Sequence, residues 1–184
     1  MKEDRRIAHS KERIRTSLAE CLQTTSLDKI SVKEICEKAD INRSTFYAHY
    51  TDIFTLYNEV KKEYFIPLEE QAQRLLMHEW NYKKYLVETN RYMEQNRMIT
   101  LALYRADREA FLEKVNEIAG NQELWRGTGL EVSFEYKKEF VLTGLLSVVM
   151  KWLRKERRES PEELAETIYV LTKTALKPGK GVHA

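Results

Sequence analysis

The stretch that decides the fold is SVKEICEKADINRSTFYAHYTDIFTLY, residues 31–57. Ser31 and Glu34 have the spacing of a capping box, which marks the start of a helix. The apolar residues of this helix, Val32, Ile35, Cys36 and Ala39, share one face. Asp40 stands where the chain must reverse, and aspartate tolerates positive φ better than most residues other than glycine. Asn42 is a favourable N-cap for a further helix over 43–49. Two short helices joined by a tight turn predict a helix-turn-helix.

The flanking segments supply the other helices of this domain. Residues 7–24 carry an apolar stripe that includes Ile14 and Leu18, and another helix begins at Thr51 or Asp52. We expect Pro67 to end or kink that helix. Because helices this short are marginal alone, they must share a core. The predicted core consists of Leu18, Ile35, Ile41, Phe46 and Tyr50.

Helical spacing continues to the end of the chain. We predict helices over 68–78, 82–96, 97–106, 108–119 and 132–156, with a glycine-containing loop at 120–131. Ser160, Pro161 and Glu163 mark the start of a last helix, which ends before Pro178. The predicted fold class is all-α, with about nine helices. Its predicted domains are a helix-turn-helix DNA-binding domain at 1–50, a connecting helix at 51–66, and a helical regulatory and dimerisation domain at 67–184.

Composition is that of a globular chain, with 33% charged residues, 42% hydrophobic residues and a net charge of +2. This overall charge neither favours nor excludes a nucleic-acid partner, so any electrostatic footprint must be local. Basic residues gather near the N-terminus, at Arg5, Arg6, Lys11, Arg13 and Arg15. The longest uncharged apolar stretch, between Glu139 and Lys151, is far short of the ~20 residues of a membrane span. With no secretory signal, and with Cys21 and Cys36 on apolar helix faces, we expect a cytoplasmic protein with reduced thiols and no membrane partner.

The second helix of a helix-turn-helix enters the major groove of DNA with its first residues toward the bases. Here Arg43 can donate two hydrogen bonds to a guanine, while Ser44 and Thr45 can reach bases or phosphates. Phe46 and Tyr50, four residues apart, would pack this helix onto its neighbours. Short polar helices bounded by aromatic residues also occur in many other helical proteins, and the polar residues would then be incidental surface.

The run from Ser31 to Tyr57 resembles the DNA-binding signature of the TetR-type transcriptional regulators. That pattern has Thr or Ser opening the second helix, an Ile–Ala pair, a turn glycine, Ser-x-Gly-Ser/Thr, Tyr-x-His-Phe, and a lysine opening the fourth helix. Three departures from it matter, at Asp40, at Ser44 and at Ile53, which replaces the lysine. The C-terminal region more distantly resembles the dihydroxyacetone-kinase-regulator-like branch of the same family.

The resemblance implies that a double-stranded DNA operator is a partner. It implies groove contacts from Arg43, Ser44 and Thr45, and phosphate contacts from Ser31, Tyr47 and His49. We call the second helix of the helix-turn-helix, predicted over 43–49, the reading helix. We count Asn42, which opens it, with these DNA-binding residues.

The helix at 132–156 is apolar on more than one side, which predicts that one side faces a second copy of the chain. The alternative is complete burial within one subunit. The predicted homodimer interface consists of Phe140, Leu145, Val149, Trp152, Leu164, Ile168 and Leu171.

The family resemblance also implies a small-molecule effector, for which we assign no ligand-binding residue. Aromatic and methionine side chains could line its pocket or belong to the plain core, namely Trp80, Tyr85, Met93, Met98, Tyr104 and Trp125. We expect no catalytic site, cofactor or metal, because no Glu-x-x-His pair, phosphate loop or nucleophile motif occurs.

Together these features predict a ligand-responsive repressor that acts as a homodimer on a palindromic operator. The alternative is a helical dimeric interaction module or co-regulator with weakened or lost DNA binding, which Ile53 in place of lysine favours.

Overall fold

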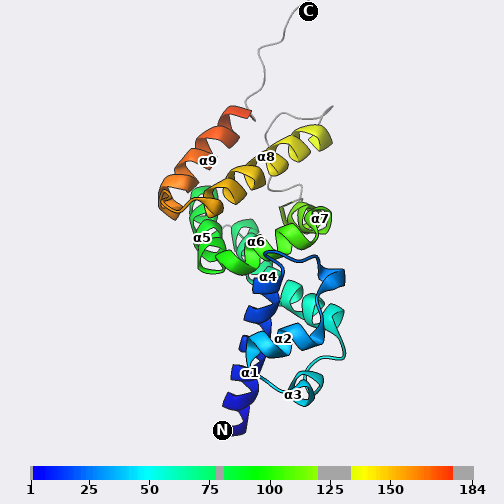
Figure 1. Ribbon diagram of the computed structural model, residues 1–184. Helices are drawn as coiled ribbons and strands as arrows, with labels where there is room; N and C mark the ends of the chain where they lie inside the picture. The colour runs from blue at the N-terminus through cyan, green and yellow to red at the C-terminus, as the bar shows by residue number, and fades with distance from the viewer. Residues whose placement is uncertain (1, 78–80, 120–133, 176–184) are drawn as a thin grey trace, which may run out of the picture. The chain divides into compact units, whose positions relative to one another are not determined.

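The computed structural model describes residues 2–77, 81–119 and 134–175. Over these residues the secondary structure consists of nine α-helices and one 3-10 helix, with no strand, which confirms the predicted all-α class (Figure 1). The first five elements are α1 (Lys2–Cys21), η1 (Leu27–Lys29), α2 (Val32–Ala39), α3 (Arg43–Tyr47) and α4 (Ile53–Leu76).

The remaining helices are α5 (Tyr82–Gln95), α6 (Arg97–Ala106), α7 (Arg108–Ala119), α8 (Phe134–Arg154) and α9 (Pro161–Ala175). They begin and end close to the predicted bounds. The predicted loop at 120–131 and the tail from Pro178 lie outside the described residues. No helix in the described ranges combines the length and the apolar content that crossing a membrane requires.

The chain divides into two compact units. Unit 1 comprises residues 1–67 and 97–108, and unit 2 comprises residues 68–96 and 109–184. The division falls within α4, directly after Pro67. Residues 97–108, which the sequence analysis places in the regulatory region, are grouped with unit 1.

The core of unit 1 is formed by side chains from α1, α2, α3, the segment after α3 and α4. Leu18, Ile35 and Phe46 are fully buried and Tyr50 is nearly so, as predicted. Ile41 is only half-buried, so its assignment to the core is wrong. Its N–H donates to the carbonyl of Cys36 at 3.0 Å, the hydrogen bond of a Schellman motif, which holds Ile41 at the turn instead of beneath it.

Pro67 does not end the fourth helix, because α4 continues through it to Leu76. A proline inside a helix loses one backbone hydrogen bond and costs about 3 kcal/mol. Buried side chains before and after it, Tyr64, Phe65, Leu68 and Ala72, keep helical spacing. Their burial offsets that cost, and the predicted division into helices ending at 66 and beginning at 68 is wrong.

Unit 2 is organised around α9, which packs along α5 and against α8. Ser160 and Glu163 form the predicted capping box at its start. The Glu163 N–H donates to Ser160 Oγ at 3.2 Å, and the Ser160 N–H donates to a Glu163 carboxylate oxygen at 2.8 Å. The side chain of Asn90 in α5 donates to the Pro161 carbonyl at 3.3 Å. The first turn of α9 is thus fixed by its own cap and by α5.

Asp40 generates a stability prediction, because it adopts φ 48° and ψ 56°. The variants Asp40→Gly and Asp40→Ala both lose the carboxylate, but only alanine retains a Cβ in the left-handed region, which costs about 1 kcal/mol. We expect the glycine variant to be more stable by about that amount, measured by urea unfolding. At Asp28, in a 3-10 helix with ordinary φ, the order should reverse. A more stable Asp40→Ala variant would contradict the account of this turn.

Candidate nucleic-acid interface and dimer surface

Ser31 caps α2 and is exposed. Its Oγ accepts the Glu34 N–H at 3.2 Å. This hydrogen bond uses a lone pair of the hydroxyl and leaves its proton to donate elsewhere, for example to a phosphate oxygen. The capping box predicted from the sequence would have the Glu34 carboxylate accept from the backbone of Ser31. In the structure this carboxylate instead accepts from Cys21 Sγ in α1, at 3.4 Å.

The turn between α2 and α3 is held from α1. Arg13 Nη2 donates to the backbone carbonyl of Asp40 at 3.0 Å and to its carboxylate at 2.9 Å. The two residues are far apart in sequence, and no local pattern signals this contact. It fixes the reversal that brings α3 out beside α2.

Asn42 stands at the predicted N-cap position of α3, in extended conformation. Its carbonyl accepts from the N–H groups of Thr45 and Phe46 at 3.0 and 3.2 Å, but its side chain makes no capping hydrogen bond. The amide is instead exposed, as are Arg43 and Ser44. Thr45 is half-buried. The start of α3 therefore presents a guanidinium, a hydroxyl and an amide at the surface.

The opposite side of α3 is anchored by aromatic rings. Phe46 is fully buried, and the Tyr50 ring lies 5.7 Å from it. Tyr47 meets the Phe46 ring edge-on at 5.6 Å and remains 57% exposed, while His49 is half-buried. The phenol of Tyr47 and the imidazole of His49 therefore follow the polar residues at the start of α3 and can form hydrogen bonds.

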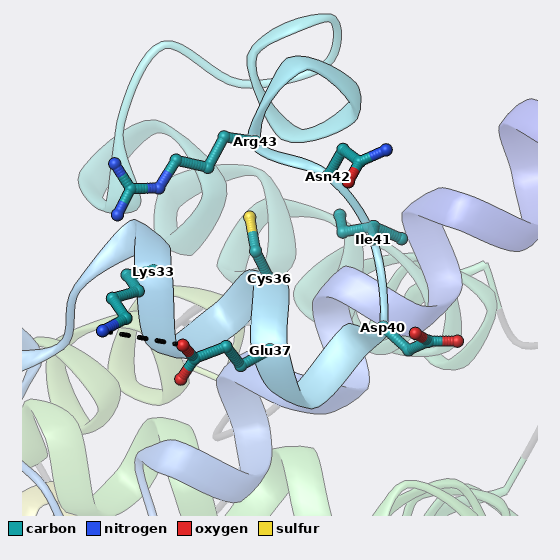
Figure 2. Close-up of a pocket in the computed structure, with 7 residues that line it drawn as sticks. All are labelled: Lys33, Cys36, Glu37, Asp40, Ile41, Asn42 and Arg43. Atoms are coloured by element: carbon teal, nitrogen blue, oxygen red, sulfur yellow. Dashed lines mark ion pairs between the residues drawn. The ribbon is translucent and has the colours of Figure 1, made fainter.

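An open hollow of about 520 Å³ lies at the turn between α2 and α3 (Figure 2). Arg43 and Lys33 extend on the same side of it, and Lys33 pairs with Glu37 at 3.7 Å. Lys33 is exposed in the first turn of α2, two residues after Ser31, and the sequence analysis did not single it out. The turn and α3 bring it near Arg43, which adds a second cation to this surface.

The basic residues near the N-terminus contribute less free charge than their number suggests. Lys11 pairs with Glu59 at 3.0 Å, Arg13 with Asp40 at 2.9 Å, and Arg15 with Glu59 at 3.2 Å. Arg6 is exposed, and the side chain of Arg5 lies outside the described part. Three of the five predicted basic residues thus serve contacts within unit 1.

Ile53, which replaces the lysine of the family pattern, is 6% exposed and belongs to the core of unit 1. The exposed side chains just before it and in the first turn of α4 are Thr51, Asp52, Phe54 and Thr55. Asp52 accepts the Thr55 N–H at 2.7 Å, and this backbone hydrogen bond lowers the pKa of its carboxyl. The start of α4 is therefore capped by an anion and offers no cation at that position.

The predicted dimer surface needs correction. Trp152, Val149, Leu164 and Ile168 are buried within the subunit, because α8 and α9 pack against each other and α9 packs on α5. The Trp152 indole also donates to the carbonyl of Glu159 at 2.8 Å. The predicted interface residues that remain accessible are Phe140, 74% exposed, Leu171, 48% exposed, and the half-buried Leu145.

The candidate pocket residues are divided between the two units and the part of the chain outside the described residues. Met93 is buried in unit 2, while Met98 is 37% exposed and belongs to unit 1 with Tyr104. Tyr85 is half-buried in unit 2, and desolvation raises its pKa to about 12. Trp80 and Trp125 lie outside the described residues.

The architecture is that of an all-α protein with an N-terminal helix-turn-helix. The TetR C-terminal family model, described as "Transcriptional regulator C-terminal region", matches residues 80–174, somewhat more than half of the chain. This chain belongs to the TetR family of transcriptional regulators. A search of curated protein sequences gives no match.

Solved structures share the fold over nearly the whole chain. A TetR transcriptional regulator from Streptococcus agalactiae 2603V is 24% identical, with a TM-score of 0.67, over 94% of this chain and 98% of that chain. NalD, the secondary repressor of the MexAB-OprM multidrug efflux pump in Pseudomonas aeruginosa, is 17% identical, with a TM-score of 0.62, over 94% and 99%. The dihydroxyacetone kinase operon activator DhaS is 15% identical, with a TM-score of 0.57, over 91% and 96%. The family and these neighbours are transcriptional regulators, not enzymes.

The two cysteines generate a reactivity prediction. Burial raises the pKa of the Cys21 thiol to about 11 and also raises that of Cys36, against which the nearby Arg43 guanidinium acts. Since the thiolate is the nucleophile, both groups should react slowly with iodoacetamide at pH 8 in the folded protein. Unfolding in urea should accelerate alkylation of Cys21 by at least about tenfold, as a pKa returning toward ~8.5 implies, and should also accelerate that of Cys36. Equal rates in folded and unfolded protein would contradict this burial.

Proposed function

We propose that this protein is a sequence-specific DNA-binding transcriptional regulator that acts as a homodimer on a palindromic operator. The observation that carries the proposal is that α3 has polar, exposed residues at its start and aromatic, buried residues on its other side. Arg43 and Ser44 are exposed at its start, while Phe46 and Tyr50 anchor it from behind. A short helix with this division of polar and apolar residues suits insertion into the major groove.

Each polar group has a distinct role in this proposal. Arg43 binds a guanine through two hydrogen bonds, and Ser44 and Thr45 contact neighbouring bases or phosphates. The hydroxyl groups of Ser31 and Tyr47 and the imidazole of His49 bind phosphates and fix the register, with Asn42 beside them. Lys33, on the same side of the hollow as Arg43, supplies a further phosphate contact.

A second copy of the chain covers the outward face of α8 and α9. The exposed apolar side chains of this face are Tyr136 and Phe140 on α8 and Val170 and Leu171 on α9. Gly144, four residues after Phe140 on α8, is exposed, and a Cβ added there meets no atom within 4 Å, so a partner helix can approach closely. A symmetric pair would present two reading helices to two half-sites, and each weak contact gains from the other.

The same proposal includes a small-molecule effector and repression as the regulatory outcome. The dimer can adopt conformations that differ in the distance between the two reading helices. A ligand that binds one of these conformations more tightly shifts the population of dimers toward it, by no more than its difference in affinity. NalD, which shares the fold, is named a repressor. The protein acts in the cytoplasm, where its operator lies, and requires no cofactor.

A second candidate function is favoured by Ile53. Its burial removes the cation that the family pattern places at the start of α4, and Asp52 adds an anion nearby. Under this alternative the protein is a helical dimeric interaction module or co-regulator that no longer binds DNA. Selection of duplexes from a random-sequence library separates the two, because only a DNA-binding regulator enriches a consensus.

The role of Arg43 is tested by replacing it with alanine. We expect Arg43→Ala to lose about 1–3 kcal/mol of discrimination between the selected duplex and one with a changed guanine. Tyr47→Phe should instead weaken binding to both duplexes equally, since phosphate contacts carry no sequence information. Binding is measured by fluorescence anisotropy at several fixed salt concentrations.

Arg157→Ala is the matched control for charge, because Arg157 is exposed in unit 2. It removes the same charge without touching the reading helix and should leave discrimination unchanged. Retention of full discrimination by Arg43→Ala would refute the assigned role.

The dimer surface is tested at Phe140. Phe140→Asp places a charge at the centre of the proposed apolar contact and should shift the protein from dimer to monomer at micromolar concentration in sedimentation velocity. Met77→Asp is the control, because Met77 is an equally exposed apolar residue, at 75%, and belongs to neither α8 nor α9. If both variants sediment as wild type does, the interface lies elsewhere.

A further inference from the structure

Tyr50 introduces a polar group beneath the reading helix. It occupies the position at which the Tyr-x-His-Phe pattern has phenylalanine, and it is 1% exposed. A buried hydroxyl is costly unless it is hydrogen-bonded. The extra oxygen of Tyr50 must therefore have a partner within unit 1.

That partner is Glu59 of α4. One carboxylate oxygen of Glu59 accepts from the Tyr50 hydroxyl at 3.3 Å, from Lys11 Nζ at 3.0 Å and from Arg15 Nη2 at 3.2 Å. Arg15 also donates to Glu63. We call Lys11, Arg15, Tyr50 and Glu59 the Glu59 cluster. It joins α1, the segment after α3, and α4.

The charges of the cluster are sheltered and balanced. The side chains of Lys11, Arg15 and Glu59 are 33%, 22% and 31% exposed, and Glu63 supplies the second negative charge. Desolvation opposes ionisation of Glu59, but the hydrogen bonds from Lys11 and Arg15 outweigh it and lower the pKa of the carboxyl. Glu59 is therefore an anion at neutral pH and a strong acceptor for the Tyr50 hydroxyl.

Tyr50 carries this constraint to the reading helix. Its N–H donates to the Phe46 carbonyl at 2.9 Å, and its ring packs on the ring of Phe46. Because α3 has only five residues, its direction depends on such contacts and not on its own stability. A ring without the hydroxyl could still fill the space, but nothing polar would fix its angle to α1 and α4.

We infer that Tyr50 and Glu59 are positioning residues that set the angle of α3 and thereby the selectivity among DNA sequences. The inference rests on the proposed function and identifies what orients its reading helix. Base discrimination requires Arg43 to reach two atoms in one geometry, whereas non-specific attraction depends mainly on charge. Loosening the Glu59 cluster should therefore reduce the ratio of specific to non-specific affinity.

The test compares two changes from tyrosine to phenylalanine. Tyr50→Phe keeps the ring and the net charge and should lower the affinity ratio about three- to tenfold, with non-specific affinity unchanged. Tyr57→Phe is the control, because Tyr57 is also buried in unit 1, on α4, and is not part of the cluster. The probes are a duplex that wild-type protein selects from a random library and the same duplex with scrambled half-sites, at one salt concentration.

Glu59→Gln provides the second variant, and the double variant with Tyr50→Phe completes a cycle. The two single losses in the ratio should not multiply in the double variant, because both variants break the same contact. A mere loss of stability lowers the amount of folded protein for both probes and leaves the ratio unchanged. An unchanged ratio in both single variants, or an equal fall in Tyr57→Phe, overturns the inference. If wild-type protein selects no consensus, the proposed function itself is rejected.

Discussion

The burial of Phe46 beneath α3 is the contact on which the rest of the interface depends. Burying such a ring contributes about 1.5–3 kcal/mol, while a helix of five residues cannot offset its own nucleation cost. The helix exists because Phe46, together with Tyr50 just after the helix, joins the core of α1 and α2. Exposure of Arg43 and Ser44 follows from that anchoring, since side chains at the start of α3 must point away from a face that the rings occupy.

Local patterns predict the helix ends of both units well, because the signals of a helix end are local. A hydroxyl at Ser31, an aspartate at Asp40 and the Ser160–Glu163 pair each act within four residues, and the structure places all of them at helix ends. The predicted helix end at Pro67 and the predicted burial of Ile41 are wrong for the converse reason. The local preference of Pro67 is to stop a helix, and the apolar character of Ile41 favours burial, but distant packing and turn geometry decided both outcomes.

The dimer surface shows a different limit of sequence patterns. Apolar spacing identifies which residues avoid water, but it does not tell whether the neighbour that covers them belongs to the same subunit. Trp152 and Ile168 are covered within unit 2, by helices whose contacts no spacing rule specifies. The residues proposed to face a second copy are therefore distinguished by the exposed fraction of their side chains within one subunit. Phe140 and Leu171 remain in water within the subunit despite their apolar side chains.

Most of the cations described on α1 form ion pairs within unit 1, which leaves fewer of them to attract a DNA backbone in the proposed complex. Lys11 and Arg15 are committed to Glu59, and Arg13 to Asp40, so these cations of α1 orient the helix-turn-helix. With Ile53 buried, α4 adds no cation at its start. In the proposed DNA complex, few cations would then supply the non-specific, salt-dependent part of binding. Under the proposed function, recognition of an operator would depend on hydrogen-bond geometry at the start of α3, and so on the residues that hold that helix at its angle.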